Sequence, residues 1–117
     1  MKDFKNLKVW HKSIELVKLI YQNTKAFPKE EIFGIVGQMR RCVISIPSNI
    51  AEGPGRGTKK EFNHFLNIAL GSAYELETQL IISNELNFIP NEYFNKSNSL
   101  LDEIRKMIFG LKKSLDK

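Results

Sequence analysis

Cysteine is nearly absent from this chain, and histidine is scarce. Among the 117 residues the one cysteine is Cys42, which excludes an internal disulfide and favours a reducing compartment. Only His11 and His64 accompany it, and the three residues lack the spacing of zinc ligands. We therefore expect no structural metal.

Long apolar runs are absent as well. Nowhere do eighteen apolar residues follow one another, so no membrane-spanning helix and no membrane partner are predicted. The first residues, Met-Lys-Asp-Phe-Lys, lack the apolar stretch of a secretory signal. We expect a soluble, cytoplasmic protein in which residues 1–117 form a single domain around one core.

Lysine and arginine are missing from one quarter of the sequence. Residues 61–90 hold none against four acids, whereas residues 1–30 hold seven against three, residues 31–60 five against two, and residues 91–117 six against four. The net charge of +5 is therefore concentrated in the first half. This asymmetry favours a polyanionic partner or an acidic neighbour, such as the third helix of another copy. An equally weighted alternative is that the positive net charge only keeps the protein soluble.

Apolar residues recur three and four positions apart in four segments, and none alternates as a strand would. The pattern predicts helices over residues 7–25, 28–53, 58–86 and 91–115. The expected core stripes are Leu7, Trp10, Ile14, Val17, Tyr21 and Thr24, widened by Val9, Leu16 and Ile20; Ile32, Val36, Met39, Val43, Ile46 and Ile50; Phe62, Leu66, Ala69, Ala73, Leu76 and Leu80; and Phe94, Leu101, Ile104, Ile108, Leu111 and Leu115.

Local signals bound these helices. Pro28 suits a first turn, Gly53 suits a C-cap, and Thr58 with Glu61 forms a capping box. Pro47 removes a hydrogen bond inside the second helix, yet the apolar register passes through it unshifted. Because the turns are short, consecutive helices must pack antiparallel. We predict an all-α fold, an antiparallel up-down-up-down four-helix bundle whose second helix is kinked at Pro47.

A polar stripe runs along the second helix, opposite its apolar stripe. Five of its members recur three to four positions apart, and Asn49 lies directly after one of them. The members are Gln38, Arg41, Ser45, Ser48, Asn49 and Glu52. Outward polar residues are usually only solvated, but this stripe leads into a basic, glycine-rich turn. The stripe is therefore a candidate binding or oligomer surface.

Basic residues at that turn and in the second helix are candidates for anion contacts. Arg56, Lys59 and Lys60 lie beside the amino end of the third helix, whose unpaired amides favour an anion. Arg40 and Arg41 are adjacent and point in different directions, so they suit a broad surface or ion pairs with the third helix. The turn is not a P-loop, because its glycine spacing is wrong and a helix precedes it.

No combination of residues predicts catalysis. Glu52, Glu75 and Glu77 have no accompanying nucleophile or histidine. A di-iron bundle needs two Glu-x-x-His pairs, and the sequence has one, at Glu61 and His64. We expect a non-enzymatic protein without a cofactor or a small-molecule substrate.

Several motifs together resemble a known family. They are Phe27-Pro28, Gln38-Met39-Arg40-Arg41, Ala69-Leu70-Gly71-Ser72, Glu75-Leu76-Glu77-Thr78 and, above all, Ser45-Ile46-Pro47-Ser48-Asn49-Ile50-Ala51-Glu52-Gly53. The chain resembles the 23S ribosomal RNA intervening-sequence proteins, bacterial four-helix bundle proteins without a settled activity. The resemblance implies an up-down-up-down bundle and a homo-oligomeric ring, often a pentamer. A related group, the accessory variability proteins of diversity-generating retroelements, is basic and works with nucleic acid.

Two hypotheses follow. The first is an RNA-associated or DNA-associated homo-oligomer; carried over from the resemblance, its nucleic-acid contacts are Arg40, Arg41, Arg56, Lys59 and Lys60. The second is a structural or protein-interaction module whose polar stripe serves ring assembly without binding nucleic acid. Salt-sensitive RNA binding separates them.

Overall fold

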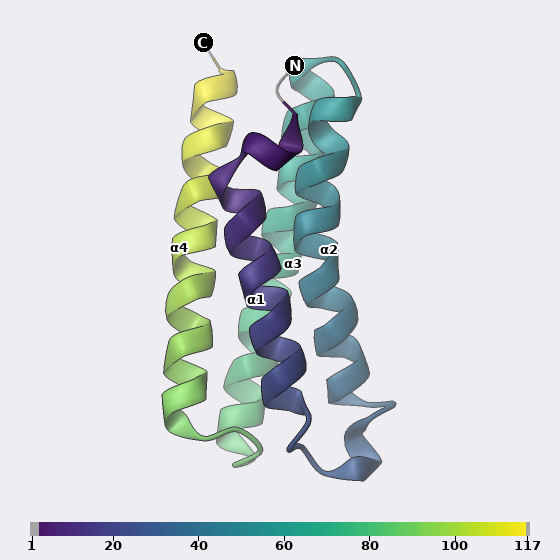
Figure 1. The fold of residues 1–117 in the computed structure, drawn as a ribbon, viewed down its shortest axis with the longest axis vertical. Coiled ribbons are helices and arrows are strands. Elements are labelled where there is room, and N and C mark those ends of the chain that lie inside the picture. Colours follow the sequence, from purple (N-terminus) through teal and green to yellow (C-terminus); the bar gives the residue numbers. More distant parts are fainter. Residues whose placement is uncertain (1–2, 117) are drawn as a thin grey trace.

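The computed structural model describes residues 3–116, which form four long helices and two short 3₁₀ helices and no strand. In chain order these elements are η1 (Phe4–Asn6), α1 (Lys8–Thr24), η2 (Lys29–Glu31), α2 (Ile35–Gly55), α3 (Lys59–Glu85) and α4 (Asn91–Leu115). Consecutive long helices run in opposite directions, so both chain ends lie at the same end of a rod of 45 × 23 × 20 Å (Figure 1). The predicted antiparallel four-helix bundle is confirmed.

The apolar stripes of the helices meet in one core. All six residues of the predicted α3 stripe are buried, as are five of the six predicted in α2. In α4 the central residues Leu101, Ile104 and Ile108 are fully buried, while Phe94, Leu111 and Leu115 pack at the edge of the core. The periodicity therefore located three of the four stripes correctly.

The core face of α1 is centred on the residues that widen its predicted stripe, and Leu7 and Thr24 at the two ends of that stripe are buried as well. Val9, Leu16 and Ile20 form the buried face, whereas the predicted core residues Ile14 and Val17 are only partly buried. The polar residue Ser13 completes the buried face, because its hydroxyl donates to the Trp10 carbonyl at 2.7 Å and is thereby satisfied. A satisfied serine in the core breaks the apolar pattern on which the prediction depended.

The predicted start of α2 at Pro28 is wrong. Pro28 precedes the 3₁₀ helix η2, and the backbone then leaves helical geometry at Gly34, where φ is −102° and ψ is −120°. α2 begins only at Ile35. As a consequence Ile32, predicted to lie in the core, is 52% exposed.

α2 runs without interruption through Pro47, as the unshifted register predicts. Beyond Pro47, the Ser48 hydroxyl donates to the Ile44 carbonyl at 2.8 Å. The kink expected at Pro47 stays a prediction. The helix also passes the predicted stop at Gly53 and ends at Gly55, because a proline in the last turn removes only one of the bonds that hold it.

The remaining boundaries follow local chemistry. Thr58 caps α3 as predicted, since its hydroxyl oxygen accepts a hydrogen bond from the Glu61 amide at 3.1 Å. The turn before it contains Gly57 at a φ of +86°, a conformation that favours glycine. α4 begins at Asn91, as predicted, with Pro90 in the N-cap position.

Candidate nucleic-acid interface

Folding turns the charge asymmetry of the sequence into an asymmetry between two sides of the rod. Residues 3–60 carry 11 lysines and arginines against 5 acids, and residues 61–116 carry 5 against 8. The first group builds α1 and α2, which pack side by side (Figure 1). The exposed residues of α1 include Lys8 and Lys18, with Glu15 as the one acid of that helix, and exposed Lys25 follows directly after its last residue. The α1–α2 side is therefore the basic side of the molecule.

The five basic residues predicted to bind nucleic acid lie in two groups rather than in one site. Arg40 and Arg41 belong to the first half of α2, whereas Arg56 follows its last turn and Lys59 and Lys60 begin α3. Fifteen residues of helix separate Arg41 from Arg56, which corresponds to about 22 Å at 1.5 Å per residue. A ligand that contacts both groups must extend along the bundle.

Arg40 holds α1 against α2. Its Nε donates to the Thr24 hydroxyl at 3.1 Å, Nη2 donates to the Tyr21 carbonyl at 3.5 Å, and the guanidinium lies 4.7 Å from the centre of the Tyr21 ring. Nη1 makes no hydrogen bond to the residues that the structure describes. Arg40 is thus a half-buried, oriented cation and not a mobile surface charge.

Arg56 is partly neutralised. Its guanidinium pairs with the Glu52 carboxylate at 2.7 Å and lies 5.0 Å from the centre of the Phe65 ring. Both charged side chains are about half exposed, so the pair contributes at most about 1 kcal/mol and competes weakly with a phosphate. Lys59 and Lys60 are exposed in the first turn of α3.

The polar stripe of α2 divides into two parts. Ser45 contacts α3, because its hydroxyl lies 2.9 Å from that of Ser72, while the Asn49 amide donates within α2 to the Ser45 carbonyl at 2.8 Å. The remaining members, Gln38, Arg41, Ser48 and Glu52, are exposed. The prediction that this stripe forms one oligomer surface is untested, and these four members are the ones that offer exposed area for it.

Comparison with known proteins agrees with the fold and identifies the family. A sequence model of the family described as 23S rRNA-intervening sequence protein matches residues 5–110. The chain belongs to this family. A crystal structure from Bacteroides thetaiotaomicron, described as a protein with unknown function from the S23 ribosomal protein family, is similar over 90% of this chain and 95% of its own, with 30% identity and a TM-score of 0.83. No curated protein sequence matches the chain.

In this 23S rRNA-intervening sequence protein the thiol of Cys42 is buried against α3. Its Sγ donates to the Ser72 carbonyl at 3.0 Å. Burial, reinforced by the nearby Glu75 carboxylate, raises the pKa of the thiol to about 12. Because the thiolate is the reactive form, this cysteine is a core residue and not a nucleophile.

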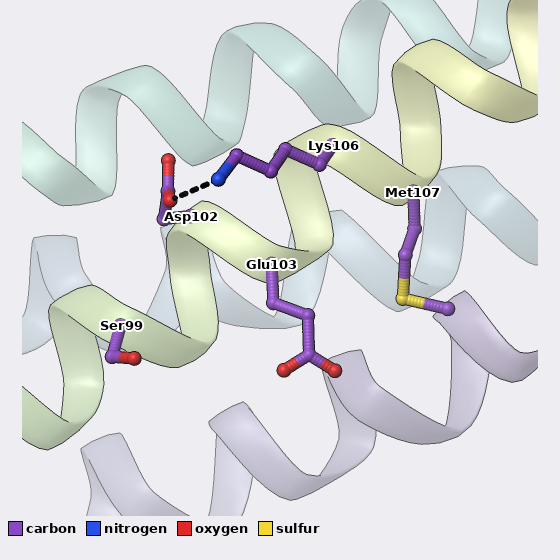
Figure 2. A pocket seen from close by; sticks show the side chains of 5 residues that line it. All are labelled: Ser99, Asp102, Glu103, Lys106 and Met107. Atoms are coloured by element: carbon purple, nitrogen blue, oxygen red, sulfur yellow. Dashed lines mark ion pairs between the residues drawn. The ribbon is translucent and has the colours of Figure 1, made fainter.

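Two carboxylates of α4, Asp102 and Glu103, are engaged in ion pairs. A shallow surface pocket of about 430 Å³ is lined by Ser99, Asp102, Glu103, Lys106 and Met107 (Figure 2). Glu103 and Met107 point toward α1, where Glu103 pairs with Lys12 at 3.2 Å. Asp102 pairs with Lys106 at 3.1 Å, and this contact lowers the pKa of Asp102. Carboxylates held in this way do not form an acid and base pair.

The helices of this family member present neither a membrane span nor a metal cluster in the part that the structure describes. No helix within residues 3–116 combines the length and hydropathy that crossing a bilayer requires. Over the same range no three histidine, cysteine, aspartate or glutamate side chains gather as metal ligands do. His11 instead contacts the Lys5 carbonyl at 2.7 Å.

Sequence reasoning missed the contribution of two lysines to the basic side. Lys25 and Lys29 flank the turn Phe27-Pro28 and line a pocket together with Arg40, which is more than ten residues away in the chain. The one available signal was the presence of a lysine on each side of an apolar, proline-containing turn. That signal is common in solvated turns and gives no hint that an arginine of the next helix joins them.

Proposed function

We propose that this protein is a non-enzymatic, homo-oligomeric bundle that binds RNA through the basic α1–α2 side. The proposal depends on the charge asymmetry between the two sides of the rod. A basic face attracts the phosphates of RNA, and the counterions that leave those phosphates on binding favour the complex. The family description, which names an intervening sequence of 23S rRNA, supports RNA over DNA as the ligand.

Contacts to phosphate position a protein on nucleic acid without reading its sequence. Two exposed cations at the edge of this side belong to the separated groups: Arg41, which lines a pocket with Ser72 and Glu75 of α3, and Lys60 in the first turn of α3. Their separation along α2 matches an extended backbone better than a compact ligand. We therefore expect affinity for many RNA sequences and a strong dependence on salt.

RNA affinity measured by fluorescence anisotropy is expected to fall steeply as salt is raised. With three phosphate contacts to single-stranded RNA, raising the salt from about 50 to about 200 mM lowers the affinity about 20-fold. Binding that is equal at both concentrations contradicts a phosphate-driven interaction. If no RNA binds even at the lower concentration, the proposed function is wrong.

The same measurement of RNA affinity on the double variant Arg41→Ala, Lys60→Ala tests where on the protein RNA binds. This variant should bind RNA more weakly than the matched control Lys106→Ala, Lys113→Ala, which removes two exposed lysines of α4 and the same net charge. The loss should be similar for unrelated RNA sequences. Equal losses in the two double variants would show that only net charge matters.

Self-association is supported by a different face. The sequence of α3 beyond residue 60 contains no lysine or arginine, and its exposed side chains include Ile68, Ile81, Ile82 and the acid Glu75. Contact between this surface and the basic side of a second copy joins two different faces, and repeated contacts of that kind close into rings. We propose such a ring, a pentamer by family resemblance.

The mass of the purified protein in solution tests the ring. Light scattering should give a multiple of the 13.5 kDa chain, and the multiple should decrease at high salt because the contact pairs opposite charges. A strict monomer at all concentrations contradicts self-association. A ring that ignores RNA at low salt would favour the alternative function, a structural module that binds no nucleic acid.

A further inference from the structure

A pocket of about 370 Å³ lies beside the carboxyl end of α1, where the chain turns into α2. It combines two kinds of side chain from α1, the connecting segment and α2: the cations Lys25, Lys29 and Arg40, and the apolar residues Phe27, Ile32 and Val36. We call it the α1–α2 pocket. Its volume is at the lower end of the range for small-ligand sites, which is about 300–1,000 Å³.

The charge of the α1–α2 pocket is strongly positive. Three cations line it, and no described lining residue is a carboxylate. The carboxyl end of α1 carries a partial negative charge of about half an elementary charge, but Arg40 already donates to the Tyr21 carbonyl at that end. Lys25 and Lys29 are exposed and add two further charges. The pocket therefore favours an anion.

The guanidinium of Arg40 has a fixed orientation in this pocket. The Thr24 hydroxyl, the Tyr21 carbonyl and the Tyr21 ring fix the guanidinium, while Nη1 has no hydrogen-bond partner among the described residues. A guanidinium fixed by its neighbours loses less conformational entropy on binding than a mobile lysine does. An oriented donor of this kind suits a phosphate oxygen.

The apolar part of the pocket suits a flat, apolar group attached to the anion. Val36 and Phe27 are nearly completely buried, and Phe27 packs on Phe88 with ring centres 5.7 Å apart. Ile32, by contrast, is 52% exposed, although it is a large aliphatic side chain next to this wall. A ligand that covers Ile32 removes apolar surface from water.

We infer that the α1–α2 pocket holds one unstacked nucleotide of single-stranded RNA, an inference that depends on the proposed function. The phosphate contacts Lys25, Lys29 and Arg40, and the base lies against the apolar wall. Bases in a duplex are paired and stacked, whereas unpaired bases can leave the stack and enter a protein pocket. The pocket thus gives the basic side a preference for single-stranded over duplex RNA.

Binding of a short single-stranded RNA, and of a duplex of the same sequence, tests this inference with two matched pairs of variants. The double variant Lys25→Ala, Lys29→Ala should lower the affinity for single-stranded RNA about tenfold. The control double variant Lys106→Ala, Lys113→Ala should lower it about twofold. Both pairs remove two exposed lysines. The wild-type protein should bind the single strand more tightly than the duplex, and the first variant should lose that preference.

An uncharged change separates a pocket from a merely basic surface. Ile32→Ser should weaken single-strand binding about threefold, whereas Ile44→Ser, which alters an isoleucine of similar exposure on α2, should leave it unchanged. In methyl NMR spectra, RNA should shift the signals of Ile32 and Val36 and leave that of Ile81 in place.

The outcomes distinguish failure of the pocket from failure of the proposed function. The inferred nucleotide pocket is wrong, and the proposed function stands, if RNA binding depends on salt but the two double-lysine variants lose the same affinity for RNA. In that case Ile32→Ser should also leave the affinity for RNA unchanged. If the wild-type protein binds no RNA, both are wrong. Equal affinity for single strand and duplex also overturns the pocket.

Discussion

Leu76→Ala is expected to lower the free energy of unfolding by about 3–5 kcal/mol. Leu76 lies near the middle of α3 with none of its surface exposed, and it belongs to the core to which all four helices contribute. Truncation removes buried apolar surface and leaves a cavity that the rigid neighbouring helices cannot fill. Urea unfolding followed by circular dichroism at a fixed protein concentration measures the loss as a lower midpoint.

The control for this prediction lies on the same helix. Ile81 is 47% exposed, so Ile81→Ala should cost less than about 1 kcal/mol. If Leu76→Ala costs no more than Ile81→Ala, the α3 stripe does not face the core and the packing described above is wrong.

Gly53→Ala is expected to destabilise the bundle by about 1–3 kcal/mol, although alanine is the better helix former. A Cβ atom at Gly53 would lie 2.8 Å from Cδ1 of Phe62 and 3.3 Å from both its Cα and its carbonyl oxygen. The ring could rotate away, but the backbone of α3 could move only with the helix. The clash therefore separates α2 from α3 where the two helices meet at the tight turn.

Gly71→Ala is the matched control. Gly71 is also inside a helix, and an added Cβ would meet nothing within 4 Å. It should stabilise the protein by about 0.5–1 kcal/mol, because alanine favours the helix. The two variants should thus shift the unfolding midpoint in opposite directions. Equal shifts would contradict the close approach of α2 and α3 at Gly53.

α3 shows how far sequence reasoning reaches. Its start was predicted from the capping box at Thr58, and its stripe from spacings of three and four that continue without a slip to Leu80. Both signals are local, since a cap and a helical period depend on residues within one or two turns. α2 was harder, because the backbone at Gly34 departs from the helix where proline and two acids suggested a first turn.

The candidate site was predictable only in part. The positions of the basic residues and their concentration in the first half of the chain are properties of the sequence. Their roles are not. Arg40 was expected on a broad surface or in an ion pair with the third helix, yet it connects α1 and α2. Its partners Thr24 and Tyr21 are 16 and 19 residues away, and no periodicity encodes them. The Glu52–Arg56 pair, by contrast, is a local i,i+4 contact on one helix face.

The sequence by itself determined the four helices, their antiparallel order and the excess of positive charge on the first two, because helical periodicity, caps, short turns and composition act locally. The tertiary structure decided which part of the predicted α1 stripe lies at the centre of the core, and it turned Arg40 toward α1 while Arg41 lines a pocket with α3. It also brought Lys25 and Lys29 together with Arg40 around one pocket. These outcomes depend on how each helix is rotated against its neighbours, and that rotation is set by the packing of side chains from all four helices at once.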